Sequence, residues 1–89
     1  MTTPLRKNPD AFAETEIDDE VVLMDLSNGD FFSIKDTGLA IWNLIDGSLD
    51  RAALLSRLAQ DYGAAEADIA ADVDEFLAAV TAAGFVAAD

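Results

Sequence analysis

The hydrophobic pattern of this chain changes once, near residue 35, and this change constrains the fold more than any single motif does. Before it, short apolar runs rich in β-branched and aromatic residues predict three strands, at Phe12–Ile17, Glu20–Leu26 and Phe31–Ile34. After it, apolar residues recur at helical spacing. The order of elements therefore predicts an α+β fold, a three-stranded antiparallel sheet followed by three helices.

The turns between the expected strands are also readable. Asp18-Asp19 supplies the first turn, and Asn28-Gly29 stands between the second and third strands. Asn-Gly between two apolar runs is the strongest short-range hairpin signal, because both residues tolerate the positive φ of a type I′ turn. We expect an antiparallel meander with Phe31–Ile34 as an edge strand.

Each of the three helices has recognisable ends. We expect them to run from a cap at Asp36 or Thr37 to Asp46-Gly47, from a cap at Ser48 or Asp50 to Gly63, and from about Ala65 to Ala83. Trp42 is expected to anchor the core between sheet and helices. Gly38, in the first turn of the first helix, indicates close approach to a neighbouring element. Helices after a small sheet suggest a winged-helix-like architecture.

The two ends of the chain are expected to lie outside the packed domain. Residues 1–11 hold both prolines and two of the five cations, which predicts a flexible N-terminal tail. We place the domain at residues 12–86, closed by the apolar pair Phe85-Val86, and expect residues 87–89 to fray.

Composition excludes several function classes. With no His and no Cys, the chain lacks the side chains of imidazole and thiolate catalysis and of soft metal sites. Eighteen Asp and Glu against five Lys and Arg leave a net charge of −13, which disfavours nucleic acid and anionic membranes as partners. No apolar run approaches the length of a membrane span and no signal-peptide pattern is present. We therefore expect a cytoplasmic protein.

Three carboxylates on the last helix require separate consideration. Asp68, Asp72 and Glu75 are spaced to share one flank, as a hydrolase or a magnesium site would need. No base, phosphate-binding loop or other polar cluster converges on them, so a solvated helix face explains them better. We expect no catalytic residue, metal or cofactor.

The expected edge strand is the more informative feature. If Phe32 and Ile34 face the core, Phe31 and Ser33 face the other way, beside unpaired backbone groups. Proteins usually protect such an edge with charge, and an unprotected one favours strand addition by a partner. The last helix, lying over the sheet, would form the second wall of a groove. A peptide with apolar anchors and a basic residue would suit that groove.

An ordered series of short motifs resembles the PqqD-like family, the recognition elements for precursor peptides of ribosomally synthesised, post-translationally modified natural products (RiPPs). The series spans about Phe12 to Val86 and comprises Leu23 to Leu26, Asn28-Gly29, Phe31 to Ile34, Thr37-Gly38, Ile41-Trp42, Asp46-Gly47, Leu54 to Tyr62 and Gly84-Phe85-Val86. Two positions depart from the family pattern: Ile34-Lys35 replaces Leu-Asn, and Phe31 replaces the more frequent Tyr. Both departures make the subfamily harder to assign, but neither changes the fold that the resemblance implies.

The resemblance implies a winged-helix-like domain that has no catalytic activity of its own. It would bind the leader of a precursor peptide as an added strand and deliver it to a maturation enzyme, a radical SAM enzyme or a leader peptidase. Carried over by position, the peptide-binding residues would be Phe31, Phe32, Ser33, Ile34, Ile69, Asp72, Val73 and Phe76.

Two other function classes compete with this prediction. A winged-helix DNA-binding regulator is disfavoured because residues 64–83 hold five carboxylates and no cation. A small acidic enzyme is disfavoured because no side chains converge. The residues leave open which RiPP subfamily this is, and whether the edge strand lets two copies form a homodimer.

Overall fold

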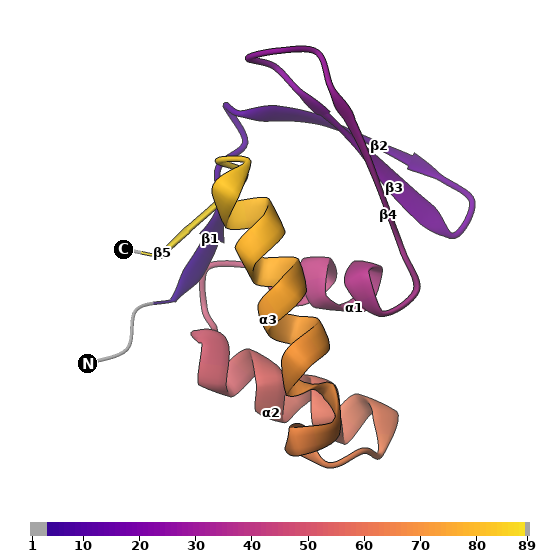
Figure 1. The fold of residues 1–89 in the computed structure, drawn as a ribbon, viewed down its shortest axis with the longest axis vertical. Helices are drawn as coiled ribbons and strands as arrows, with labels where there is room; N and C mark the ends of the chain where they lie inside the picture. Colours follow the sequence, from indigo (N-terminus) through magenta and orange to yellow (C-terminus); the bar gives the residue numbers. More distant parts are fainter. Residues whose placement is uncertain (1–3, 89) are drawn as a thin grey trace.

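Two small sheets and three helices form the fold (Figure 1), and the computed structural model describes residues 4–88 of the chain. Along the sequence the elements are β1 (Leu5–Lys7), β2 (Phe12–Ile17), β3 (Glu20–Asp25), β4 (Phe31–Lys35), α1 (Asp36–Leu44), α2 (Arg51–Tyr62), α3 (Glu66–Ala82) and β5 (Val86–Ala88). The predicted α+β class, with a three-stranded antiparallel sheet before three helices, is confirmed.

The larger sheet has the strand order β2-β3-β4, with both pairings antiparallel. Residues facing each other across β3 and β4 include Leu23 and Phe32, and Val21 and Ile34. The inward residues of β3 are buried while its outward residues are only half-buried, as expected for a sheet that packs helices on one face. The helices lie together on one side of this sheet in Figure 1.

The β3–β4 connection differs from the predicted type I′ turn. The loop between Asp25 and Asp30 is longer, with Gly29 at φ +78° and no positive φ at Asn28. The Asp25 carboxylate accepts hydrogen bonds from the Ser27 backbone (2.9 Å) and hydroxyl (2.6 Å), and Asn28 Oδ1 accepts from the Asp30 N–H at 2.9 Å. These side-chain bonds satisfy the backbone of a wider turn, so only the glycine needs the left-handed conformation.

The helix ends follow the predictions in part. Asp50 caps α2 by accepting from the Ala53 N–H at 2.8 Å, and Gly63 ends that helix in the left-handed conformation. The predicted caps Asp36 and Thr37 are wrong, because α1 follows β4 directly and has Lys35 at its N-cap without a side-chain bond. With no loop between β4 and α1, the strand position fixes the start of the helix.

The expectation of a flexible tail is wrong for Leu5–Lys7. These residues form β1, which pairs with β5 at the other end of the chain. Leu5 is buried, its N–H donates to the Leu49 carbonyl at 2.8 Å, and its carbonyl accepts from Gly47 at 3.0 Å. The expected fraying is wrong for Ala87 and Ala88, which lie in β5; residues 1–3 and Asp89 lie outside the described part. Pairing between the two chain ends is a long-range contact that local composition does not encode.

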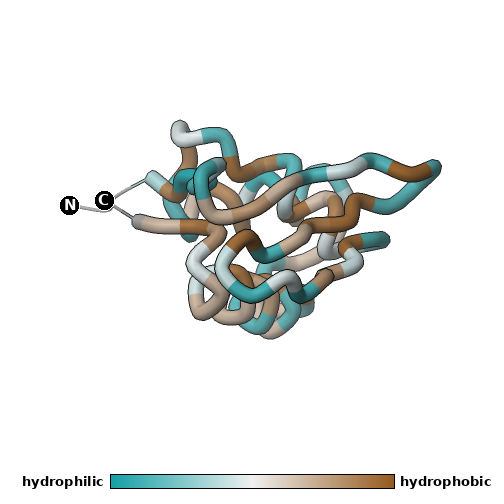
Figure 2. The backbone as a smooth tube through the Cα atoms, turned by 90° about the horizontal axis from the view of Figure 1, so that it is seen from above, coloured by the Kyte–Doolittle hydropathy of each residue, from teal (hydrophilic) through white to brown (hydrophobic). Residues whose placement is uncertain are grey.

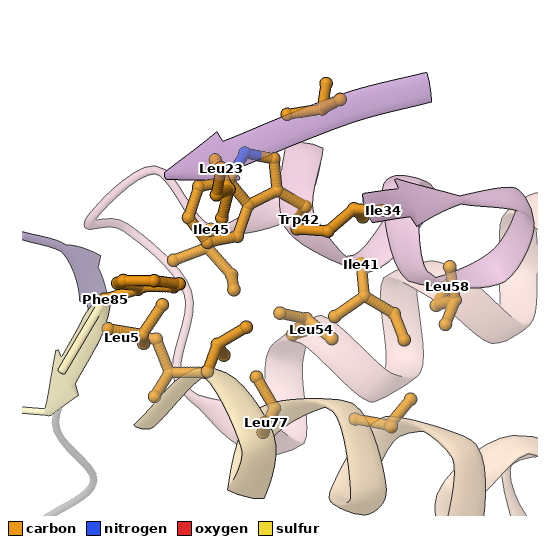
Figure 3. Close-up of a cluster of buried hydrophobic side chains, with 14 of the residues drawn as sticks. Leu5, Leu23, Ile34, Ile41, Trp42, Ile45, Leu54, Leu58, Leu77 and Phe85 are labelled. Atoms are coloured by element: carbon orange, nitrogen blue, oxygen red, sulfur yellow. The ribbon is translucent and has the colours of Figure 1, made fainter. Parts of the chain in front are cut away.

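The core lies between the inner face of the larger sheet and the three helices (Figure 3). Its fully buried large side chains are Trp42, Phe85, Leu23, Ile41, Ile45, Leu54, Leu58 and Val73. Trp42 is fully buried, as predicted, and meets Phe12 edge to face at a centroid distance of 5.3 Å. Its indole Nε1 donates to Glu14 on β2 at 3.1 Å. Figure 2 shows the hydrophobic segments toward the middle of the molecule, with largely hydrophilic outer turns.

Candidate functional site

Strand β4 is an edge of the larger sheet, and its pairing pattern shows which backbone groups it leaves open. The Asp25 N–H donates to the Asp30 carbonyl at 2.7 Å, which makes this a hydrogen-bonded pair of the antiparallel ladder. Such pairs alternate, so Phe32 and Ile34 bond to β3 while Phe31, Ser33 and Lys35 direct their N–H and C=O groups away from it. The edge therefore offers three outward-facing residues to another strand.

The side chains of β4 alternate between the two faces of the sheet. Ile34 is buried, and Phe32 packs edge to face against Phe85 at 5.2 Å while remaining 38% exposed. Phe31 is on the opposite face and is 70% exposed, and the Ser33 hydroxyl there donates to Glu20. The predicted directions of these side chains are confirmed, although Phe32 is only partly covered by the core.

An apolar hollow of about 190 Å³ lies between β4 and the C-terminal half of α3. We call it the apolar hollow; it is lined by Phe32, Ser33, Ile34, Phe76, Ala79, Val80, Ala83 and Phe85. Helix α3 contributes Phe76, Ala79 and Val80 to this lining, so its wall combines an aromatic ring with smaller apolar side chains. An aliphatic or aromatic side chain would fit this environment.

A second hollow of about 470 Å³ continues toward the end of β4 and the start of α1. We call it the acidic hollow; it is lined by Lys35, Asp36, Thr37, Gly38, Ile41, Asp72, Glu75, Phe76 and Ala79. Phe76 and Ala79 line both hollows, so the two form one β4–α3 groove with Phe76 between them. A Cβ atom on Gly38 would lie 3.4 Å from the Phe76 ring, which confirms the predicted close approach.

The eight sequence-predicted residues do not all reach this groove. The structure brings together Phe32, Ser33, Ile34, Asp72 and Phe76 along it, although the Ser33 hydroxyl is on the opposite face of the sheet, where it donates to Glu20. Three others lie elsewhere: Phe31 projects from the other face of β4, Ile69 packs partly buried against the core, and Val73 is fully buried inside it. Val73 is on the core-facing side of α3, so it supports the groove wall without being accessible.

The predicted site lacks several groove residues: Lys35, Asp36, Thr37, Gly38 and Ile41 at the end of β4 and in α1, and Glu75, Ala79, Val80, Ala83 and Phe85 in and after α3. Ala79 and Ala83 are four residues apart, and both follow the Asp72–Phe76 turn on the same side of α3. That i, i+4 series of small residues was the available signal. Phe85 follows the helix and had no local signal, because only the tertiary fold places it under Phe32.

Three neighbouring carboxylates in the middle of α3 differ in whether they form an ion pair. Asp74 forms a two-point ion pair with Arg51 of α2, at 2.5 and 2.8 Å, and this pairing lowers the pKa of Asp74 and raises that of Arg51. Asp72 and Glu75 are exposed and have no ion-pair partner within residues 4–88. The described residues contain no group of three or more potential ligands that could hold a metal ion.

A further hollow of about 650 Å³, larger than either hollow of the groove, is lined by residues that include Lys7, Phe12, Glu14 and Asp46. Two of its charged residues, Lys7 and Glu14, make contacts that hold the fold together. Lys7 Nζ stands 4.4 Å from the Trp42 ring centroid, and Glu14 accepts from the same indole. Burial lowers the pKa of Lys7, against the opposing effect of Glu14 and Asp46. This cluster attaches β1 and β2 to α1, so we place the candidate site at the β4–α3 groove.

Comparisons with known proteins agree with this architecture. The family model for coenzyme PQQ synthesis protein D (PqqD) matches residues 20–86. A solved structure, described as TbiB1 in complex with the TbiA(beta) leader peptide, superposes with a TM-score of 0.77 at 26% identity, covering 91% of this chain and 93% of that chain. A search of curated proteins found no match. No helix in the described residues is long and apolar enough to cross a membrane.

The family match covers both the strand that forms the open edge and the helix that faces it, and the structural match covers nearly the whole fold. This chain therefore belongs to the PqqD family, the PqqD-like recognition elements of RiPP biosynthesis.

Proposed function

We propose that this protein captures the leader segment of a ribosomally synthesised precursor peptide as an added strand on β4 and presents it to a maturation enzyme. One observation carries the proposal: the uncharged residues Phe31–Ile34 of the edge strand β4 have an open edge, and an apolar hollow lies directly beside them. Strand addition uses both features, since main-chain bonds supply affinity and side-chain pockets supply specificity. The similar TbiB1 structure contains a leader peptide, which supports the same ligand class here.

The role of each part of the site follows from the geometry. Phe31, Ser33 and Lys35 would exchange backbone hydrogen bonds with the leader, while Phe32, Ile34 and Phe76 would surround its inward side chains. Ile69 and Val73 would act indirectly, by holding α3 in place behind the groove. None of these contacts requires catalysis by this chain, and the enzyme that receives the leader would supply the chemistry.

The proposal is tested by titrating the ¹⁵N-labelled full chain with synthetic leaders of short precursor peptides encoded beside its gene. We expect chemical-shift changes at Phe31–Lys35 and along the groove side of α3, with slowed amide exchange at Ser33 as its N–H becomes hydrogen-bonded. Changes confined to the opposite edge β2, or no binding at tens of micromolar, would contradict the proposal.

Presentation to an enzyme needs its own measurement. The measurement uses the purified maturation enzyme that is encoded beside the gene of this protein. Processing of the precursor peptide by that enzyme should require this protein, and adding the protein back should restore it. If the enzyme processes the precursor at an unchanged rate without this protein, presentation to the enzyme is contradicted, whereas binding of the leader is not. Salt-sensitive binding of duplex DNA would favour a regulator instead.

A further inference from the structure

The two hollows of the β4–α3 groove differ in chemistry, and this difference defines the peptide more closely than strand addition alone. The apolar hollow is bounded by Phe32, Val80 and Phe85, whereas the acidic hollow is bounded by Asp72 and Glu75. Phe76 separates them. A strand lying along β4 would pass both in a fixed order.

The pairing of β4 determines which side chains of an added strand enter the groove. Residues directly opposite each other in a sheet point to the same face, and successive residues alternate between faces. Phe32 and Ile34 are on the groove face of β4. Residues of the added strand that lie opposite them therefore point into the groove, and the next inward residue is always two positions away.

The acidic hollow has an uncompensated negative charge. Asp36, Asp72 and Glu75 line it against the single cation Lys35, and no ion pair forms among them in the described part of the chain. The neighbouring Asp74 differs, because Arg51 already neutralises it. A cationic side chain beside an apolar floor that includes Ile41 and Phe76 would gain both attraction and packing for its alkyl stem.

We propose, resting on the proposed function, that the β4–α3 groove selects peptide strands that carry an apolar anchor and a Lys or Arg at an even spacing of two or four residues. The anchor fills the apolar hollow and the cation lies over Asp72 and Glu75. In an antiparallel complex the cation precedes the anchor in the peptide sequence. A parallel complex reverses that order and keeps the even spacing.

Charge also excludes the other occupants of this groove. A second copy of this chain has the same net charge of −13 and would bring its own carboxylates to the acidic hollow. Anionic lipid and nucleic acid meet the same repulsion. A peptide with a basic residue is the ligand whose charge complements the site.

The test is selection of a random dodecapeptide display library on the immobilised full chain. We expect each enriched sequence to contain an aliphatic or aromatic anchor and a Lys or Arg two or four positions away from it. In all enriched sequences the basic residue should lie on the same side of the anchor, either always before it or always after it. A synthetic peptide from this selection should bind the Asp72→Asn/Glu75→Gln variant about 4- to 25-fold more weakly, since one exposed ion pair contributes about two- to fivefold. Affinity for the wild-type chain should fall as salt rises.

The matched control is Asp10→Asn/Glu66→Gln, which removes the same charge from exposed residues outside the groove. It should bind the selected peptide within about twofold of the wild-type chain, because distant exposed charges are screened. Equal losses in both double variants would show a general charge effect and overturn the inference.

Two further outcomes separate this inference from the proposed function. Enriched peptides that bind at β4 but lack a basic residue, or place it at odd spacing, overturn the inference and leave strand addition standing. If no peptide is enriched and the adjacent precursor leaders also fail to bind, the proposed function fails with it.

Discussion

The two edges of the larger sheet differ in what they offer to another chain. On β2, Glu14 and Glu16 bring charge to the edge, and Glu14 is held by the buried indole of Trp42. On β4 the open stretch from Phe31 to Ile34 has no charged residue, and an apolar hollow lies beside it. Charge on an edge strand discourages pairing with other chains. The same sheet thus protects one edge and leaves the other open.

The largest expected effect comes from closing the open edge with proline. Ser33→Pro removes an outward N–H without breaking a bond to β3, so leader binding should weaken roughly ten- to hundredfold, because an unmade buried hydrogen bond costs about 1–3 kcal/mol. Isothermal titration calorimetry measures this.

Glu16→Pro on β2 is the matched control. The Leu26 N–H donates to the Ala11 carbonyl, so Ala11 and Leu26 form a hydrogen-bonded pair of the β2–β3 ladder. Because such pairs alternate along the strand, Glu16 directs its N–H away from β3. This variant should bind leader normally, and Ser33→Ala should do the same because it keeps the backbone donor. Equal losses in both proline variants would break the distinction between the edges.

The second effect concerns the stability of the protected edge. Glu14→Ala leaves the buried Trp42 Nε1 without its acceptor, so the free energy of unfolding should fall by about 1–3 kcal/mol. Urea denaturation followed by tryptophan fluorescence measures it. Glu16→Ala should stay within about 0.5 kcal/mol, and Glu14→Gln should recover part of the loss by keeping an acceptor. If Glu14→Ala matches Glu16→Ala, the edge carboxylate has no structural role.

The third effect separates the two faces of β4. Phe32 packs on Phe85, so Phe32→Ser should lower the free energy of unfolding by about 1–2 kcal/mol, as expected for a partly buried phenylalanine. Phe31→Ser should change it by less than about 0.5 kcal/mol, since that side chain is 70% exposed. Thermal unfolding of both variants makes the comparison. A larger loss for Phe31→Ser would reverse the assignment of faces.

The smallest effect is a pH dependence in the loop that positions β4. Hydrogen bonds from the Ser27 hydroxyl and N–H lower the pKa of the Asp25 carboxyl. A lowered folded-state pKa contributes stability above the unfolded value of about 3.9, and this contribution is lost as pH falls through the folded-state pKa. Ser27→Ala should therefore destabilise the chain near pH 6 and lose that effect at strongly acidic pH.

Carboxyl ¹³C titration measures the same effect directly. The pKa of Asp25 should rise in Ser27→Ala and stay unchanged in Ser48→Ala, where the hydroxyl instead serves Asp46. An unchanged Asp25 pKa in Ser27→Ala would mean that the hydroxyl does not hold the loop carboxylate.

Much of the fold was predictable because its signals are local. The change from strand to helical pattern, the Asp50 cap, the Gly63 stop and the buried Trp42 are each set by short-range periodicity or by the chemistry of single residues. The wider β3–β4 loop was not predictable, because the Asp25 and Asn28 side chains compete with the Asn-Gly turn for the same backbone groups.

By itself the sequence determined the element order, the uncharged edge strand and the acidic face of the last helix. Only the tertiary structure decided that β1 pairs with β5, that Val73 faces the core instead of the groove, and that Phe85 lies under Phe32. These contacts join residues far apart in the chain. They form only when packing brings the elements together, because the position of a helix on a sheet depends on the whole core and not on a local pattern.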